Sequence, residues 1–350
     1  MKKTLIALAV LAASGAAMAQ SSVTLYGVAD GFIGSKKVEV AGVGQRQTVV
    51  SSAGINGSRW GLKGAEDLGN GIKAVFQLES GFNLDTGTSV QNGVLFNRQA
   101  FGGLSGAFGT VSLGRQYSAY DGLHGAVNQN YDAATFNAAT GGAIFGVSAN
   151  GLKDYTSRVD NSVAYTSPNF SGFSGQVVYG FGENKNTVLP GVSNKATDNA
   201  SIALTYANGP ITAGVAYQEE KTAAASVTVP GTVAQNKLKY SLIGGSYDFG
   251  MAKLVGSYNT AKNNTTKDKE GQIGVVVPFG AAAVSAGYAR SKSEAAGVSN
   301  TGKGFSLLAT YDMSKRTRLY AGAQSVKAHV GNAAAESKAT DYGLGLRHSF

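Results

Sequence analysis

Four arginines are the residues of this sequence whose type and position could act on a charged or polar molecule. Three of them lie in segments where polar and apolar residues alternate, and each falls on the polar side of the alternation: Arg59, Arg98 and Arg158. A guanidinium group stays positively charged at physiological pH and binds anions through a planar fork of N–H donors. A wall of such groups would attract anions and orient dipolar solutes.

The side of the alternation on which each arginine lies, its parity, is judged from its apolar neighbours. Arg59 lies opposite Trp60, Arg98 lies opposite Phe101, and Arg158 lies opposite Val163 and Tyr165 along their segments. The fourth arginine, Arg115, instead shares the parity of Val111 and Leu113. It would therefore face the apolar side unless Gly114 introduces a bulge, because one extra residue in a strand reverses the alternation.

Carboxylates that could face these arginines come partly from an interval without alternation. The interval between Gln116 and Asp160 is the longest of this kind, and structureless segments of such length in a compact domain are usually functional. We expect the acidic side to be formed by Asp121, Asp132, Glu79 and Asp160. A plainer alternative is that the arginines neutralise these carboxylates and hold the interval in place, and the two roles are compatible.

Catalysis finds little support in the remaining residues. A serine or aspartate mechanism needs an oriented histidine base, but the three histidines are scattered at His124, His329 and His348. The sequence has no cysteine and lacks a nucleophile elbow, a metal-spaced histidine pair and a phosphate-binding loop. We therefore expect no enzyme, no cofactor and no metal site. Because the lysines are dispersed, no nucleic-acid partner is expected either.

Composition excludes several fold classes. The chain has 350 residues, a formal net charge of +9, 49 glycines and only 5 prolines, and 43% of its residues are hydrophobic. Charged residues make up only 15%, against about 25% in typical domains. These values fit neither a disordered nor a collagen-like chain. They suit an ordered protein whose outer surface is partly apolar.

Segments of about ten residues with every second side chain apolar recur along the chain, as in a transmembrane β-barrel. Seven short connections with turn-forming residues alternate with eight longer hydrophilic ones, among them 183–199, 219–235, 262–270, 290–303 and 327–339. Fifteen connections join sixteen strands. We therefore predict an all-β fold, a 16-stranded antiparallel barrel that is closed because lipid offers no hydrogen-bond partner to a sheet edge.

The first residues predict export. Two leading lysines are followed by an apolar run and by Ala17-Met18-Ala19, the small-x-small pattern of a signal-peptidase site. We predict a cleaved signal peptide at residues 1–19 and a single transmembrane barrel domain at residues 20–350. The last strand ends on Phe350, an aromatic residue suited to the membrane interface.

Over its whole length after the leader, the chain resembles the general porins of Gram-negative outer membranes, in particular the neisserial and related branch. The segments that carry the resemblance are 23–27, 58–64, 66–71, 76–82, 97–101, 109–116, 158–163 and the terminal Phe350. The resemblance implies a homotrimer in the outer membrane, one water-filled pore per subunit and a third long loop folded inward to narrow it. It also implies contact with outer-membrane lipid and lipopolysaccharide, and recognition of Phe350 by the barrel assembly machinery.

We accordingly expect a general diffusion channel for ions and small hydrophilic solutes. The basic wall of Arg59, Arg98, Arg158 and Arg115, facing an acidic loop, predicts a weak preference for anions. Two alternatives remain open: a substrate-specific channel for an organic anion or sugar, and an adhesin or structural barrel. A specific sugar channel would show a continuous aromatic lining, whereas the polar side of these strands is mostly Ser, Thr, Gln, Gly, Lys and Arg.

Overall fold

The structure is a computed structural model that describes residues 22–128, 135–139, 154–183, 187–189, 192–193, 197–223, 235–295, 297–329, 331 and 336–350. The predicted signal peptide, residues 1–19, lies outside the described residues. Within them, no helix is long and apolar enough to cross a membrane.

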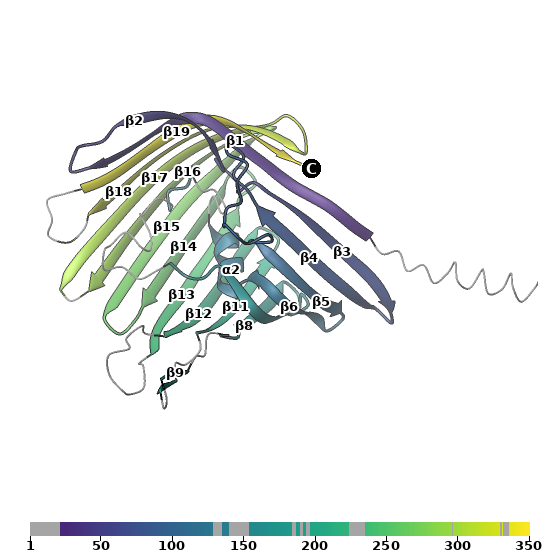
Figure 1. The fold of residues 1–350 in the computed structure, drawn as a ribbon. Coiled ribbons are helices and arrows are strands. Elements are labelled where there is room, and N and C mark those ends of the chain that lie inside the picture. The colour runs from purple at the N-terminus through teal and green to yellow at the C-terminus, as the bar shows by residue number, and fades with distance from the viewer. Residues whose placement is uncertain are drawn as a thin grey trace, which may run out of the picture.

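Antiparallel strands make up nearly all of the described chain (Figure 1). The first half contains β1 (Ser22–Val40), β2 (Arg46–Ser52), β3 (Arg59–Gly69), β4 (Ile72–Gly81), β5 (Gln99–Gly106), β6 (Gly109–Tyr117), β7 (Arg158–Thr166), β8 (Phe173–Gly180) and the small pair β9 (Thr187–Leu189) and β10 (Val192–Ser193). The second half contains β11 (Asp198–Asn208), β12 (Ile211–Ala223), β13 (Gln235–Asp248), β14 (Lys253–Lys262), β15 (Thr266–Phe279), β16 (Ala282–Ala295), β17 (Val298–Asp312), β18 (Thr317–His329) and β19 (Glu336–Ser349).

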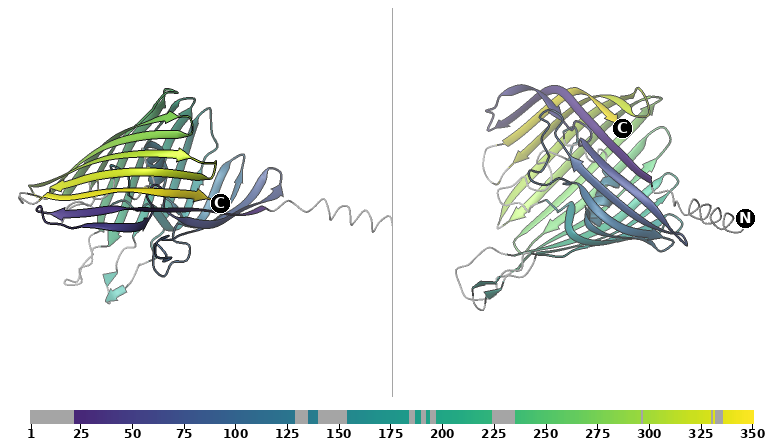
Figure 2. Two further views of the ribbon diagram at one scale, coloured as in Figure 1. Left: turned by 90° about the horizontal axis from the view of Figure 1, so that it is seen from above. Right: turned by 45° about the vertical axis from the view of Figure 1, so that its right-hand side comes forward.

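The sheet closes on itself because its first strand pairs with its last. Residues 28–40 of β1 pair antiparallel with residues 337–349 of β19, so the two ends of the chain's sheet lie side by side (Figure 2). At the seam, the backbone of Gly27 exchanges two hydrogen bonds with that of Phe350. The predicted closed barrel is therefore confirmed.

One position in the wall is built from two strands. β2 and β3 both pair with β1, β2 with its later residues and β3 with its earlier ones. The 17 strands of the sheet therefore form sixteen wall positions, as the sequence predicted. Residues 53–58 between β2 and β3 leave the ladder, and the buried carboxylate of Asp30 accepts hydrogen bonds from the amides of Gly54, Ile55 and Asn56.

The two faces of the wall differ as the alternation predicts. On the last strand the exposed side chains are Tyr342, Leu344, Leu346 and His348, and the residues between them are less exposed. Large hydrophobic side chains are exposed in this way all around the barrel. In a water-soluble protein an apolar surface of this size would be unusual, so it is the face that meets lipid.

The connections at one end of the barrel are the seven short turns that the sequence predicts. At the other end, two predicted long loops are wrong, because residues 262–270 and 290–303 are mostly strand, and in the predicted loop 327–339 the described residues 327–329 and 336–339 are strand. β14 and β15 are separated only by residues 263–265, and β16 and β17 only by residues 296–297. Hydrophilic side chains do not stop strand pairing, and here the hairpins extend beyond the apolar belt.

The third long connection carries the helix α2 (Ala119–Val127), which begins after Ser118, whose hydroxyl accepts a hydrogen bond from the Asp121 amide. α2 packs against β11, β12 and β13 on the side opposite the exposed apolar residues. Leu123 lies over Gly214 and Val127 over Gly244, where a side chain would collide with the helix. Glycine in these strands therefore makes room for the loop on the inner face (Figure 1).

Candidate functional site

A carboxylate shared by two arginines forms the centre of the candidate site. β3 and β4 pair so that Glu79 lies opposite Gly61 and Arg59 lies opposite Gly81. Glu79 is only 4% exposed. Its Oε1 accepts a hydrogen bond from Nε of Arg98 at 2.7 Å, and its Oε2 lies 3.8 Å from Nε of Arg59. The Tyr26 hydroxyl donates to the same Oε2 at 2.9 Å and thereby fixes the carboxylate.

Tyr117 connects the third arginine to this group. Its hydroxyl accepts hydrogen bonds from Nη2 of Arg98 at 2.7 Å and from Nη2 of Arg158 at 3.2 Å. The guanidinium of Arg158 also lies over the Tyr117 ring, with its Cζ 4.9 Å from the ring centroid. The structure thus brings three of the four predicted arginines together with Glu79. We call Arg59, Arg98, Arg158, Glu79 and Tyr117 the arginine cluster.

Sequence parity did not by itself predict this arrangement. Phe101 pairs with Gln77 and so shares the face of Glu79, whereas the parity argument for Arg98 placed Phe101 on the opposite face. Arg98 precedes β5, so the alternation of that strand does not extend to it. The alternation in β7 also does not predict the face of Arg158. The pairing of β6 with β7 shifts register beside Asn161, which has a φ of 48°, and Arg158 lies beyond this shift.

Arg115 lies outside the arginine cluster among the described contacts. Gly114 has a φ of 132°, but it does not introduce the bulge that would turn Arg115 to the other face. The extra residue between β6 and β7 belongs to β7, so Arg115 still pairs with Ala100 and lies on the same face as Leu113. Its guanidinium forms an ion pair with Asp160 and donates to the carbonyl oxygen of Asn97. Arg115 and Asp160 therefore form a pair of their own.

The predicted loop acids have different environments. Asp121 lies on α2 and accepts a hydrogen bond from the Tyr155 hydroxyl at 2.9 Å, and that hydroxyl is also 3.0 Å from Nδ1 of His124. Burial lowers the pKa of His124 to about 4, so the imidazole is neutral at physiological pH. The described contacts of Asp121 are thus with the helix and its Tyr155 partner. Asp132 lies outside the described residues.

A second group of acids, which the sequence did not indicate, has two members on β15, roughly half the circumference from β4, and one on β12, Glu220, which accepts hydrogen bonds from Thr156. Glu220, Asp268 and Glu270 are 5%, 4% and 2% exposed, and they occupy the inner face of β12 and β15. Asp268 pairs with Ala261, and Glu270 pairs with Asn259 and accepts from its amide at 3.3 Å. We call these three carboxylates the acidic wall. A signal was present in 267–270, where lysines and acids alternate, but strand assignment was needed to read it.

The third long connection is attached to the barrel at a second point beyond α2. Phe136 is fully buried against Phe32, Ile55 and Tyr320. The amide of Phe136 donates to the carbonyl of Gly54, and Gln324 donates to the carbonyl of Asn137 at 2.8 Å. The described parts of this connection therefore contact both the β11–β13 side and the β17–β18 side of the inner face.

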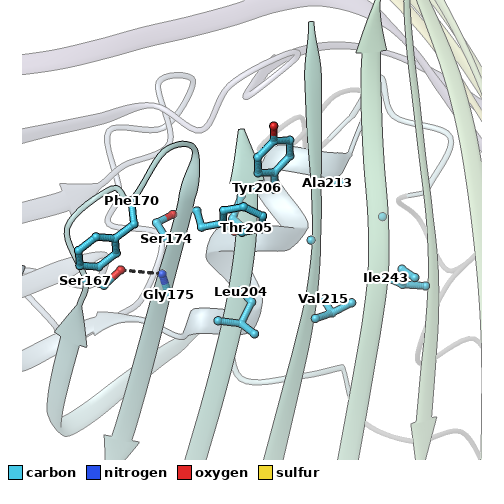
Figure 3. A pocket seen from close by; sticks show the side chains of 13 residues that line it. Ser167, Phe170, Ser174, Gly175, Leu204, Thr205, Tyr206, Ala213, Val215 and Ile243 are labelled. Atoms are coloured by element: carbon cyan, nitrogen blue, oxygen red, sulfur yellow. Dashed lines mark hydrogen bonds between the residues drawn. The ribbon is translucent and has the colours of Figure 1, made fainter. Parts of the chain in front are cut away.

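The outer face carries an apolar hollow of about 670 Å³ next to the short turns (Figure 3). Phe170, Leu204, Tyr206, Val215 and Ile243 surround it, and no charged residue lines it. Among the described residues, no cluster of three or more histidines or carboxylates has the arrangement of a metal site. The charged residues that could act on a solute include those of the arginine cluster and the acidic wall, of which Arg158 and Glu220 line a second hollow.

Comparison with known proteins places these features in a family. A family model described as Gram-negative porin matches residues 4–349. An outer membrane porin protein of Bordetella pertussis is 35% identical, and outer membrane porin protein 32 of Delftia acidovorans is 33% identical, each over 100% of both chains. A solved structure described as an anion-selective porin from Comamonas acidovorans aligns with a TM-score of 0.77 and 28% identity, covering 95% of this chain and 100% of that one. This chain therefore belongs to the Gram-negative porins and is a β-barrel protein of the outer membrane.

Proposed function

We propose that this porin is a general diffusion channel that conducts ions and small hydrophilic solutes with a preference for anions. Membership of the porin family and a closed barrel with a polar inner face support passive conduction rather than catalysis. The preference for anions rests on one observation, which is the arginine cluster.

The charge balance of the arginine cluster supports this selectivity. Arg59 and Arg98 share the single carboxylate of Glu79. Arg158 stacks on Tyr117 and forms no ion pair among the described residues, and its Nε is buried without a described partner. A guanidinium held beside a pore raises the local concentration of anions and lowers that of cations. The structural neighbour from Comamonas acidovorans is itself named anion-selective.

The acidic wall and the third connection would shape the field within the pore. By strand order, β15 lies roughly half the barrel circumference from β3 and β4, which carry Arg59 and Glu79. Cations on one side and carboxylates on the other would orient dipolar solutes between them. We propose that the α2 and Phe136 attachments hold the third loop inside the barrel, where it narrows the passage.

Assembly and partners complete the proposal. We propose a homotrimer surrounded by lipid and lipopolysaccharide, with the C-terminal strand and Phe350 recognised by the barrel assembly machinery. Phe350 is 46% exposed on the outer face, where such a partner could reach it before the seam closes. Analytical ultracentrifugation in detergent would test the trimer.

Zero-current potentials in planar bilayers under a salt gradient test the proposed selectivity. The variant R98Q/R158Q removes two charges, and the ratio of anion to cation permeability should fall about fivefold, as expected for charges acting across a few ångströms of water. The variant K315Q/R316Q removes the same charge from an exposed turn and should leave the ratio unchanged. A cation-selective wild-type protein, or equal potentials for wild type and R98Q/R158Q, would refute the role of the arginines.

A further inference from the structure

Three oxygen-bearing side chains lie together on the inner face of β14 and β15. Glu270 of β15 pairs with Asn259 of β14, and Asp268 lies two residues before Glu270, on the same face of its strand. Glu270, Asn259 and Asp268 are 2%, 0% and 4% exposed. We call these three residues the oxygen cluster. It contains two carboxylates of the acidic wall and one amide.

The carboxylate of Glu270 is buried among like charges. Its Oε1 accepts a hydrogen bond from Nδ2 of Asn259 at 3.3 Å, and its Oε2 has no hydrogen-bond partner in the described part of the chain. The charged groups that act on it electrostatically are the carboxylates of Asp154 and Asp268. A buried carboxylate in such surroundings is strongly unfavourable unless a proton or a cation neutralises it.

Further oxygens around the oxygen cluster are buried in the same way. Among the described residues, the amide Oδ1 of Asn259 and the hydroxyl of Ser293, which pairs with Asp268, have no hydrogen-bond partner. The hydroxyl of Tyr120 on α2 has none either, although Tyr120 is fully buried and interacts electrostatically with Glu270. Because buried polar atoms are nearly always satisfied, several such oxygens in one place indicate a ligand that accepts their lone pairs.

A proton would satisfy this arrangement less well than a cation. Protonation of Glu270 removes one negative charge but leaves the oxygens of Asn259 and Ser293 without a donor, whereas a cation is bound by several oxygens at once. The Asn259 amide can also turn toward a cation. A half-turn about its last side-chain bond exchanges Nδ2 for Oδ1, two atoms of similar size, and places an oxygen beside the carboxylate of Glu270.

We propose that the oxygen cluster binds a calcium ion. Carboxylate and amide oxygens are the ligands that Ca²⁺ prefers, and it accepts them in flexible geometry. Mg²⁺ demands a near-ideal octahedron and keeps several waters, for which side chains fixed on two strands and almost fully buried leave little room. A divalent ion neutralises both carboxylates, whereas a monovalent ion neutralises only one. Such a site needs no histidine or cysteine, so motif spacing in the sequence does not reveal it.

The position of the oxygen cluster makes it accessible to calcium from outside the cell. Asp268 lies close to the hairpin turn 263–265 between β14 and β15, at the end of the barrel opposite the short turns. In outer-membrane barrels the short turns face the periplasm and the longer connections face the exterior. Calcium sites of extracellular proteins bind with a Kd of about 0.1–1 mM, and we expect a similar value here.

Titration of CaCl2 into full-length mature protein, refolded in detergent without lipopolysaccharide, tests the site by isothermal titration calorimetry. We expect one calcium ion per chain. E270Q should weaken binding at least about tenfold, because it removes one of the two carboxylates. The control E294Q removes a carboxylate from the outer face of the neighbouring strand β16, where it binds Lys292, and should bind within about twofold of wild type.

Variants of Asn259 test the amide with opposite signs. N259D adds a carboxylate and should tighten calcium binding about tenfold, whereas N259A removes an oxygen ligand and should weaken it, since affinity follows the charge and number of the ligands. Without calcium, N259D should unfold at a lower temperature than wild type, because it adds a like charge beside Glu270. Calcium should reverse this difference.

Two further measurements remain interpretable even where a variant is less stable. Tb³⁺ bound at the oxygen cluster should luminesce when the nearby rings of Tyr120 and Tyr240 are excited, and CaCl2 should displace it. CaCl2 should raise the Tm of wild type and of E294Q but not that of E270Q, because the ion binds only the native state. MgCl2 at the same concentration should raise the Tm of wild type by less than about half as much.

Equal calcium affinity of wild type and E270Q would overturn the proposal, and so would an equal loss of binding in E294Q. No binding by wild type at about 10 mM CaCl2 would exclude the site. An equal Tm increase with MgCl2 would refute the assignment of calcium. None of these measurements involves conductance, so the outcome is independent of the proposed selectivity of the pore.

Discussion

Two parts of the inner wall carry opposite charge and are built differently. The arginine cluster on β3–β7 is a network in which Glu79 and Tyr117 link Arg98 and Arg158 through hydrogen bonds and Arg59 through an ion pair. The acidic wall on β12 and β15 has no cation among the described hydrogen-bond donors to its carboxylates: Glu220 accepts from Thr156 and Gln218. Glu270 accepts one hydrogen bond from Asn259 and its Oε2 has no described partner.

The difference shows how a barrel separates charge. Asp268 and Glu270 on β15 lie roughly half the circumference from Arg59 on β3, whereas Glu220 on β12 binds Thr156, two residues from Arg158. The network of the arginine cluster fixes its side chains in place, which a selectivity site requires. In the acidic wall, Glu270 instead lies close enough to Tyr120 of α2 to interact with it electrostatically.

The largest effect is expected from removing the carboxylate that holds the arginine cluster. E79Q should lower the free energy of unfolding by about 2 kcal/mol, because charge-assisted hydrogen bonds from Arg98 are weakened and like charges are left together. It should also increase the preference for anions. Urea unfolding followed by tryptophan fluorescence measures the first effect. The control E66Q changes an exposed glutamate near a turn, and a similar loss there would contradict the assignment.

Neutralising the opposite wall should change selectivity more than stability. D268N/E270Q removes two inward carboxylates and should raise the ratio of anion to cation permeability by about twofold. Zero-current potentials measure this ratio. E294Q/E336Q removes two outward carboxylates at the same end of the barrel and should have little effect. If both double variants shift the ratio equally, the inward position of Asp268 and Glu270 has no special role.

A smaller effect is expected from the link between the arginines. Y117F keeps the ring under Arg158 but removes the hydroxyl that accepts from Arg98 and Arg158. We expect a loss of about 1 kcal/mol in unfolding free energy and a noisier single-channel current, since the guanidinium groups become less ordered. Y311F, at an exposed tyrosine of β17, serves as the control. Identical current noise in both variants would argue against an ordering role for the hydroxyl.

The smallest effect concerns pH and the helix that faces the acidic wall. Burial lowers the pKa of His124 to about 4, below the value of 6.5 in an unfolded chain. Folding therefore favours the neutral imidazole. The free energy of unfolding is unaffected by His124 above pH 6.5 and decreases as the pH falls from 6.5 toward 4. At pH 5.5 the cost should be about 1 kcal/mol. Amide exchange of α2 should speed up over this range in wild type but not in H124Q, and a pH-independent wild type would exclude the effect.

Much of the fold could be predicted because its signals are local. Alternation in residues 72–82 or 341–350 identifies a strand with one apolar face without knowledge of its neighbours. The short turns were likewise predicted from their own residues. The hairpin ends at 262–270 and 290–303 were not, because hydrophilic strands outside the membrane show no alternation of polarity and differ from loops only in their pairing.

The candidate site could be predicted only in part. Arg59 lies within a regular strand, so parity placed it correctly on the face of Glu79. Arg98 and Arg158 lie next to a strand end or a register shift, where counting residues no longer gives the face, whereas counting did give the face of Arg115, which it shares with Leu113. Tyr117 and the acidic wall were missed because their roles depend on contacts with residues distant in sequence.

The sequence by itself determined that the chain forms a lipid-facing barrel of sixteen strands with a polar interior. That outcome follows from a period of two and from the requirement of lipid that every backbone polar group be paired within the sheet. Only the tertiary structure decided which charged groups meet. Closure brings β1 to β19 and sets β15 across from β4, and a bulge of one residue at Asn161 ends the alternation before Arg158. Those relations depend on register, which is set by pairing between strands rather than by the residues of any one strand.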